Sequence, residues 1–214
     1  GLGRHLVPRL LERGHTVRAQ LRDPAKGRLL AGLGVEVVVG DILDAASLPS
    51  AIRGCEIVMN LATAVPRPGT PPDWTANDRI RREGTANLLA ACVSAGVPRV
   101  VQQSIAMLHC GAGDQWVDED APIETGPVTE SAADMEKLVR DTKLDWRIVR
   151  GGAFYGSGTG RDEAWRDAAR DGSLRLPGDG SDYISLIHVA DMATAVIAVA
   201  FGATPRSTLV ACDD

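Results

Sequence analysis

The sequence is poor in aromatic side chains and in cysteine. Only 4% of its 214 residues are Phe, Trp or Tyr, although 44% are hydrophobic. The four cysteines lie far apart in the chain, and no two form a CxxC pair: Cys55, Cys92, Cys110 and Cys212. This spacing disfavours a disulfide framework and a thiolate metal site. Scattered thiols are typical of a reducing compartment, which predicts a cytoplasmic protein with no bound metal.

Long hydrophobic runs and long basic runs are also missing. The longest weakly polar stretch, Met192 to Phe201, is too short to span a bilayer. No signal peptide is visible, but the chain starts abruptly, so a lost leader stays open. The net charge is −5, and the longest basic run, Arg79 to Arg82, is interpreted as a solvated helix face. Neither a membrane nor a nucleic acid is an expected partner.

What the sequence does contain is an alternation of β-branched runs with helical patterns. Strands are predicted at Thr16–Leu21, Val35–Val39, Ile57–Leu61, Val97–Gln102 and Trp146–Val149. Helices are predicted at Leu2–Arg13, Asn77–Ala95, Ser131–Thr142 and Val189–Phe201. The strands lack a clean polar–apolar alternation, as parallel strands covered on both faces do. The fold class predicted is therefore α/β with a doubly wound parallel sheet.

Glycine, proline and polar residues predict three loops, at Val65–Pro72, Gly151–Gly160 and Gly111–Thr129. In open α/β sheets, ligands bind beside the loops at the carboxyl ends of the strands. The chain also opens Gly1-Leu2-Gly3 and enters a helix at once. Glycines at such a turn let backbone amides approach a pyrophosphate at the helix N-terminus. Taken alone, two glycines at a flexible chain start explain this pattern equally well.

The order of further motifs along the chain supports a pyrophosphate-binding turn at the chain start. The text GRHLVPRLLERGHTVRA is followed by Gly40-Asp41 and then by Asn60-Leu61-Ala62. Together with EGTANLLAACVSAGVPRVV and LIHVADMATAV, it resembles the extended and atypical short-chain dehydrogenase/reductases of the NAD-dependent epimerase/dehydratase family. The resemblance covers nearly the whole chain. It implies a Rossmann-like fold with a small C-terminal substrate-binding lobe.

The resemblance also implies a division of the chain. The family opens with Gly-x-x-Gly-x-x-Gly, and Gly3 matches the last glycine, Leu2 the residue before it and Gly1 the variable position. Residues 1–155 are then an NAD(P)-binding domain whose first strand is missing. Residues 156–188 are part of the substrate lobe, and residues 189–214 are a returning helix and strand.

Further cofactor residues follow from the same resemblance. Arg22 falls where the family reads the adenosine ribose, with Lys26 close by, and an arginine there suits the 2′-phosphate of NADP. The alternative is NAD, with Asp23 reading the ribose and Arg22 on the surface. The resemblance places Asp41 and Ile42 against adenine. It places Leu61, Ala62 and Thr63 beneath the pyrophosphate and ribose, and Gly151, Gly152 and Ala153 near the nicotinamide.

The catalytic pair of the family is missing from the sequence. The family uses Tyr-x-x-x-Lys on one helix face, where the ammonium lowers the pKa of the tyrosine and holds the nicotinamide ribose. The only tyrosines here, Tyr155 and Tyr183, have no lysine four residues later. Alignment on the segment MEKL puts Val128 at the tyrosine position and Ala132 at the lysine position. A shifted register gives Thr129 with Ala133 or Glu130 with Asp134, and neither restores the pair.

Two other residues remain candidates for the chemistry. Ser104 in VVQQSIAM resembles the strand-end serine of the family, with a loop-capping serine as the alternative. Tyr155 lies in a segment that resembles Arg-Pro-x-x-x-Tyr-Gly and is either a packing residue or a substitute acid. His109, just beyond Ser104, is either a proton donor or an ordinary loop histidine.

These patterns predict an NAD(P)-dependent reductase, epimerase or dehydratase acting on a small carbonyl or hydroxyl compound. The alternatives are an NAD(P)-binding sensor or scaffold without catalysis, and a non-redox catalyst on the same fold. No arginine precedes the IHV segment, which argues against a sugar nucleotide because guanidinium groups are well suited to diphosphates. The resemblance also implies a homodimer that pairs through Asn77–Ala95 and Ser131–Thr142.

Overall fold

The computed structural model describes residues 1–66, 72–109, 113–175 and 179–213. Its strands are β1 (Arg18–Leu21), β2 (Glu36–Val39), β3 (Ile57–Asn60), β4 (Arg99–Ile105), β5 (Asp145–Gly151), β6 (Ala153–Tyr155), β7 (Leu186–His188) and β8 (Ser207–Ala211). Its α-helices are α1 (Gly3–Glu12), α2 (Arg28–Gly32), α3 (Leu48–Ile52), α4 (Thr75–Arg79), α5 (Thr85–Ala95), α6 (Glu130–Arg140), α7 (Arg161–Arg170) and α8 (Val189–Phe201). A π-helical turn, η3 (Ile80–Gly84), joins α4 to α5, and the 3₁₀ turns are η1 (Pro24–Gly27), η2 (Ala45–Ser47) and η4 (Ala106–Leu108).

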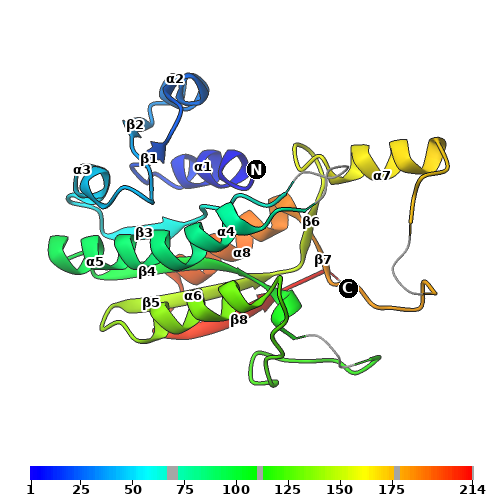
Figure 1. The fold of residues 1–214 in the computed structure, drawn as a ribbon. Helices are drawn as coiled ribbons and strands as arrows, with labels where there is room; N and C mark the ends of the chain where they lie inside the picture. The colour runs from blue at the N-terminus through cyan, green and yellow to red at the C-terminus, as the bar shows by residue number, and fades with distance from the viewer. Residues whose placement is uncertain (67–71, 110–112, 176–178, 214) are drawn as a thin grey trace.

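The strands that pair are all parallel. β3, β4, β5 and β8 form one four-stranded sheet, in that order, while β1 pairs with β2 and β6 pairs with β7. Figure 1 shows α5 and α6 on one face of the four-stranded sheet and α8 on the other. This arrangement confirms the predicted α/β fold with a parallel central sheet.

Neighbouring residues of the central strands serve opposite faces of the sheet. Val101 and Val149 pack in one cluster with α8, and Val100 and Ile148 pack in another with α5 and α6. Helix α1 joins the first cluster through Leu6. Because both faces are covered, the strands read as continuous apolar runs in the sequence.

The sheet is divided between β1 and β3. In the described part of the chain, no backbone hydrogen bonds join β1–β2 to β3. The division of the chain at residues 155 and 188 stays a prediction. Residues 156–188 contribute α7 and β7, and their role as a substrate lobe also stays a prediction.

The structure corrects several predicted elements. The segment 151–160 is not a continuous loop, because β6 lies within it and pairs with β7. The predicted helix 77–95 begins two residues earlier and is interrupted by η3. The parts of the loops 65–72 and 111–129 that fall at 67–71 and 110–112 lie outside the described residues, as does Cys110. None of the helices that the structure describes is long and apolar enough to cross a membrane.

Candidate functional site

A hollow lies at the carboxyl end of β1. Leu21, Arg22, Asp23 and Lys26 line this open space of about 420 Å³. Asp23 begins η1, and its Oδ1 accepts a hydrogen bond from Ala25 N at 2.9 Å. Arg22 and Lys26 are exposed, and neither is in an ion pair with another residue of the described ranges. Two unpaired cations therefore share one hollow, at the strand end where the family reads the ribose.

The turn after β2 is fixed against the helix α5. Asp41 Oδ1 accepts from Leu43 N at 2.9 Å, which holds the Asp41 side chain in its own turn. Asn87 Nδ2 donates to Ile42 O at 3.2 Å. A Cβ at Gly84 would lie 2.9 Å from Ile42 Cγ2, so glycine lets the η3 backbone approach this turn. The two residues predicted to flank adenine therefore occupy a well-defined loop at the same edge as the hollow.

The turn after β3 is held by two amide side chains. Ala62 N donates to Asn60 Oδ1 at 3.2 Å, and Ala64 N donates to Asn77 Oδ1 at 3.0 Å. Thr63 Oγ1 accepts from Val65 N at 3.4 Å. Leu61 packs against the buried cluster of α1 and α8. The predicted pyrophosphate turn is therefore anchored from both sides.

The start of α1 has the open geometry that an anion requires. A Cβ at Gly1 or at Gly3 would meet no atom within 4 Å, whereas Leu2 is buried in the core. No side chain caps this end of the helix. The first N–H groups of a helix have no partner within it, and together with the helix dipole they favour a phosphate. The residues present thus fit a dinucleotide.

The small residues Gly151, Gly152 and Ala153 are required by packing. A Cβ at Gly151 would lie 2.8 Å from Met192 Sδ, and one at Gly152 would lie 2.7 Å from Leu186 C. Gly152 N donates to Ala211 O at 3.0 Å, and Ala153 N donates to Ser185 O at 2.8 Å. Close approach of Met192 on α8 and of β7 thus explains the two glycines without a ligand. The place of Gly151, Gly152 and Ala153 beside the nicotinamide stays a prediction.

Ser104 belongs to a buried ion cluster. Its Oγ donates to Glu136 Oε1 at 2.6 Å, and Arg150 donates to both Glu136 oxygens, from Nε at 2.9 Å and Nη2 at 2.7 Å. Arg140 Nη2 adds a contact of 2.8 Å. Burial raises the pKa of Glu136, but the hydrogen bonds from Arg150 and Ser104 outweigh it, so the pKa lies below its usual value. Sequence reasoning missed Glu136, although a glutamate on a buried helix face signals a cationic partner.

The two other candidates for acid chemistry also have partners. Arg150 Nη1 contacts His109 Nε2, which leaves the ring proton on Nδ1, and that atom is buried without a partner. Tyr155 Oη donates to Asp213 Oδ2 at 2.7 Å. The pKa of Tyr155 is raised above its usual value, mainly by this hydrogen bond and to a smaller extent by desolvation. Whether Ser104, His109 or Tyr155 takes part in catalysis stays a prediction.

Arg81 contacts the segment that we predict to hold the dyad positions. Its Nη1 donates to Val128 O at 3.2 Å and to Ser131 Oγ at 3.0 Å, and Ala132 is buried in the next position. Arg81 is only 9% exposed. The interpretation of Arg79–Arg82 as a solvated helix face is therefore wrong for Arg81. It holds better for the side chains of Arg79 and Arg82, which are 55% and 39% exposed.

A parallel sheet, an uncapped glycine-flanked helix start and a cation-bearing hollow define a dinucleotide-binding α/β protein. The family model described as NAD(P)H-binding matches residues 1–200. The chain belongs to this NAD(P)H-binding family.

Individual proteins agree with this assignment. A 3-diazoavenalumate denitrifying reductase from a Streptomyces species is 35% identical over 210 residues, which are 92% of this chain and 68% of that protein. The structure of MoeE5 in complex with UDP-glucose and NAD is 28% identical, with a TM-score of 0.77 over 98% of this chain and 71% of that one. DesIV, a dTDP-glucose 4,6-dehydratase from Streptomyces venezuelae, is 24% identical with a TM-score of 0.82, covers the same shares, and supports the fold alone.

Proposed function

We propose that the chain is an NADP-dependent reductase of a small, largely apolar compound. The observation that carries the cofactor preference is the hollow after β1, in which Arg22 and Lys26 have no ion-pair partner among the described residues. A guanidinium binds a phosphate through two parallel hydrogen bonds, and a lysine adds a point charge. Asp23, the alternative reader of the ribose, already uses Oδ1 to cap η1.

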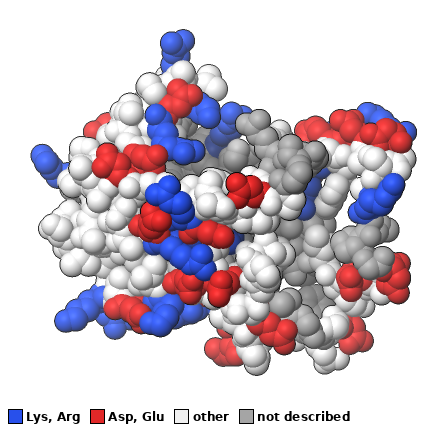
Figure 2. All heavy atoms as spheres, viewed as in Figure 1, with Lys and Arg blue, Asp and Glu red and all other residues white. Residues whose placement is uncertain are grey.

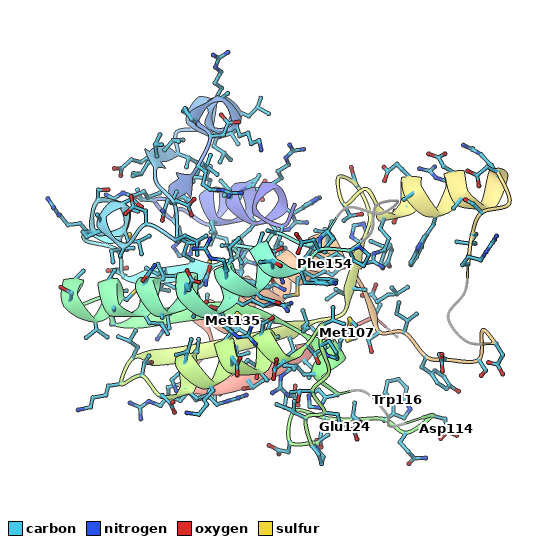
Figure 3. All side chains as sticks on the ribbon, in the orientation of Figure 1. Met107, Asp114, Trp116, Glu124, Met135 and Phe154 are labelled. Atoms are coloured by element: carbon cyan, nitrogen blue, oxygen red, sulfur yellow. The ribbon has the colours of Figure 1, made fainter. Side chains whose placement is uncertain are left out.

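Exposed apolar side chains near the strand ends support the substrate class. Met107 follows β4, and Trp116 lies on the following segment; both are largely exposed. Figure 3 shows Met107 between Phe154 and Trp116 in its view, on the side of the molecule where β4 and β5 end. Tyr183 is exposed as well. Such side chains suit an aromatic or aliphatic compound better than a sugar diphosphate.

The absence of a tyrosine–lysine pair narrows the chemistry. When bound, the nicotinamide supplies a hydride. A carbonyl oxygen also needs a proton, which the dyad normally delivers. An arenediazonium ion, the cationic form of a diazo arene, would take up the hydride and release N₂ (Ar–N₂⁺ + H⁻ → Ar–H + N₂) and needs no proton from the protein. The name of the Streptomyces relative, a denitrifying reductase of a diazo compound, points to the second kind of substrate. A small diazo arene is therefore the first compound to test, and a ketone the second.

A binding protein without turnover is the second candidate. The observation that favours it is the pair Val128 and Ala132 at the dyad positions. Such a protein would bind NADP(H) and a partner but would transfer no hydride to any acceptor. Stereospecific loss of deuterium from labelled NADPH in the presence of a diazo arene or a ketone would exclude it.

Calorimetric titration with NADP, NADPH, NAD and NADH tests the cofactor preference. We expect the two phosphorylated forms to bind more tightly. The variant Arg22→Ala should weaken NADPH about tenfold or more, the size of a lost charged hydrogen bond, and leave NADH almost unchanged. Arg28→Ala, which removes an exposed arginine of α2 outside the hollow, serves as the matched control. Equal losses for NADPH and NADH in Arg22→Ala would contradict the assignment.

A further inference from the structure

Arg81 is a buried cation with no ion pair among the residues that the structure describes. Within the described ranges, its hydrogen bonds run from Nη1, to Val128 O and Ser131 Oγ. Burial lowers the pKa of Arg81 from its usual value, and nearby Asp78 offsets this only in part. An arginine nevertheless stays protonated in proteins. Burying a charge without an opposite charge is costly, so a binding role explains Arg81 better than a contribution to stability does.

The helix surface around Arg81 is unusual for one that packs against a sheet. Asn77, Arg81 and Thr85 follow one another at a spacing of four residues and are all buried, where apolar side chains are the rule. Asn77 holds the turn after β3 through Ala64 N, and its Nδ2 is buried without a partner. Arg81 itself lies in the π-helical turn η3, a feature that often occurs at functional sites.

The position of Arg81 relative to α6 suggests what it binds. Its two protein contacts, Val128 and Ser131, are the residue at the tyrosine position and the neighbour of the lysine position, Ala132. No other cation contacts these two residues by hydrogen bond or ion pair in the described part of the chain. The guanidinium thus reaches from η3 to the place on α6 where the family carries its ammonium.

We propose that Arg81 replaces the missing lysine and holds the hydroxyl oxygens of the nicotinamide ribose. The inference rests on the proposed binding of NADP(H). A guanidinium has five N–H donors, and the two on Nη1 are used by the protein. The hydrogens on Nε and Nη2 remain for the two adjacent hydroxyls of a ribose. The contacts to Val128 and Ser131 fix the guanidinium in advance, which reduces the entropy lost on binding.

The test compares NADPH with adenosine 2′,5′-bisphosphate, which lacks the nicotinamide ribose. We expect Arg81→Met to weaken NADPH about tenfold or more and to leave adenosine 2′,5′-bisphosphate within about twofold. Arg81→Lys, which keeps the charge without the planar fork, should bind NADPH with intermediate affinity. Arg82→Met removes the neighbouring cation, which pairs with Asp134 on α6, and should change neither affinity. Circular dichroism establishes that each variant is folded.

A ligand analogue gives a second readout that a merely structural role would not alter. An NADPH analogue without hydroxyls on the nicotinamide ribose should bind the unaltered protein about tenfold more weakly than NADPH. In Arg81→Lys this ratio should shrink, and in Arg81→Met it should be close to one. The same ratio in all three proteins would overturn the assignment, as would equal weakening of NADPH and adenosine 2′,5′-bisphosphate. Failure of the unaltered protein to bind either ligand would instead refute the proposed function itself.

Discussion

Glu136 links α6 to the central sheet through charges that are almost completely buried. Its carboxylate accepts hydrogen bonds from Ser104 on β4 and Arg150 on β5, two residues that lie opposite each other in the strand register. Arg140 on α6 provides a further partner. An intact buried ion cluster stabilises the fold little more than apolar side chains of the same size would. Removing one member is nevertheless strongly destabilising, because the remaining charges stay buried without a partner.

The variant Glu136→Gln should therefore lower the free energy of unfolding at pH 7 by about 3–5 kcal/mol, because Arg150 stays buried without its partner. Urea denaturation followed by circular dichroism measures this loss. Lys137→Met, which removes an exposed ion pair one residue away, should leave the urea midpoint unchanged. A similar loss in both variants would show that the buried cluster stabilises the fold no more than an exposed ion pair does.

The same residue predicts how stability changes with pH. Because the pKa of Glu136 is lower in the folded protein than its usual 4.5, its contribution is fully present above pH 4.5. That contribution is lost as the pH falls through the folded pKa. The difference in unfolding free energy between the unaltered protein and Glu136→Gln should hence narrow below pH 4.5. A difference that stays constant with decreasing pH would contradict the assigned shift.

At the scale of the element, the start of α1 shows whether Gly3 is needed for cofactor binding or for packing. A Cβ at Gly3 meets no protein atom within 4 Å, and alanine favours a helix over glycine. Gly3→Ala should leave the melting temperature unchanged or slightly higher. It should nevertheless weaken NADPH, measured by calorimetry, because a methyl group would then stand between the helix N-terminus and the pyrophosphate. Unchanged affinity would mean that the pyrophosphate does not approach this turn.

A matched glycine gives the opposite outcome. A Cβ at Gly152 would lie 2.7 Å from the backbone of Leu186, so Gly152→Ala must displace β7. We expect a clearly lower melting temperature, in line with the roughly 1–3 kcal/mol that overpacking costs. The pair Gly3→Ala and Gly152→Ala thus distinguishes a glycine that faces open space from one that the fold itself requires.

The sequence predicted the elements that contain a long apolar helical stripe or a continuous β-branched run. The bounds of α8, Val189–Phe201, were predicted to the residue, and all five predicted strands exist. β6 was missed because it is three residues long and lies among glycines, which predict a loop. The π-turn η3 was missed because its residues have the same periodicity as a continuous helix.

The candidate site was harder to predict because burial decides its chemistry. Three arginines fall in the run 79–82, and only the structure shows that Arg81 alone turns inward. The signal that could have found it is the spacing Asn77, Arg81, Thr85, since polar residues four apart share one helix face. The hollow around Arg22 was predictable because it depends on one residue at the end of one strand.

At the scale of the whole molecule, charges of both signs are interspersed. Figure 2 shows Lys and Arg side chains beside Asp and Glu over α4 and α6. Arg82 of the π-turn pairs with Asp134 at 2.6 Å and with Glu130 at 3.3 Å, both on α6. Both ion pairs are formed within the chain, on the helices through which we expect a homodimer to pair. The homodimer itself stays a prediction.

The division of the sheet determines whether a cofactor should slow the local opening of β1 and β2. Arg22 and Asp41 follow β1 and β2, whereas Leu61 follows β3 and Gly151 ends β5. A dinucleotide that contacts all four would join two sheets that have no backbone hydrogen bonds between them in the described ranges. A two-stranded sheet is only marginally stable alone, so β1–β2 should open more often than β3–β4–β5–β8.

Hydrogen–deuterium exchange with and without NADPH tests this difference. At about 100 times the dissociation constant, binding adds about 2.7 kcal/mol to the folded state. Backbone amides of β1 and β2 should be slowed by up to this same amount, because their local opening separates the two halves of the binding site and so releases the cofactor. We expect amides of β4 and β5 to exchange through global unfolding and to be slowed by the added global stability. Slowing confined to the loops after β3 and β5, with β1 and β2 unaffected, would mean that the cofactor does not reach the hollow around Arg22.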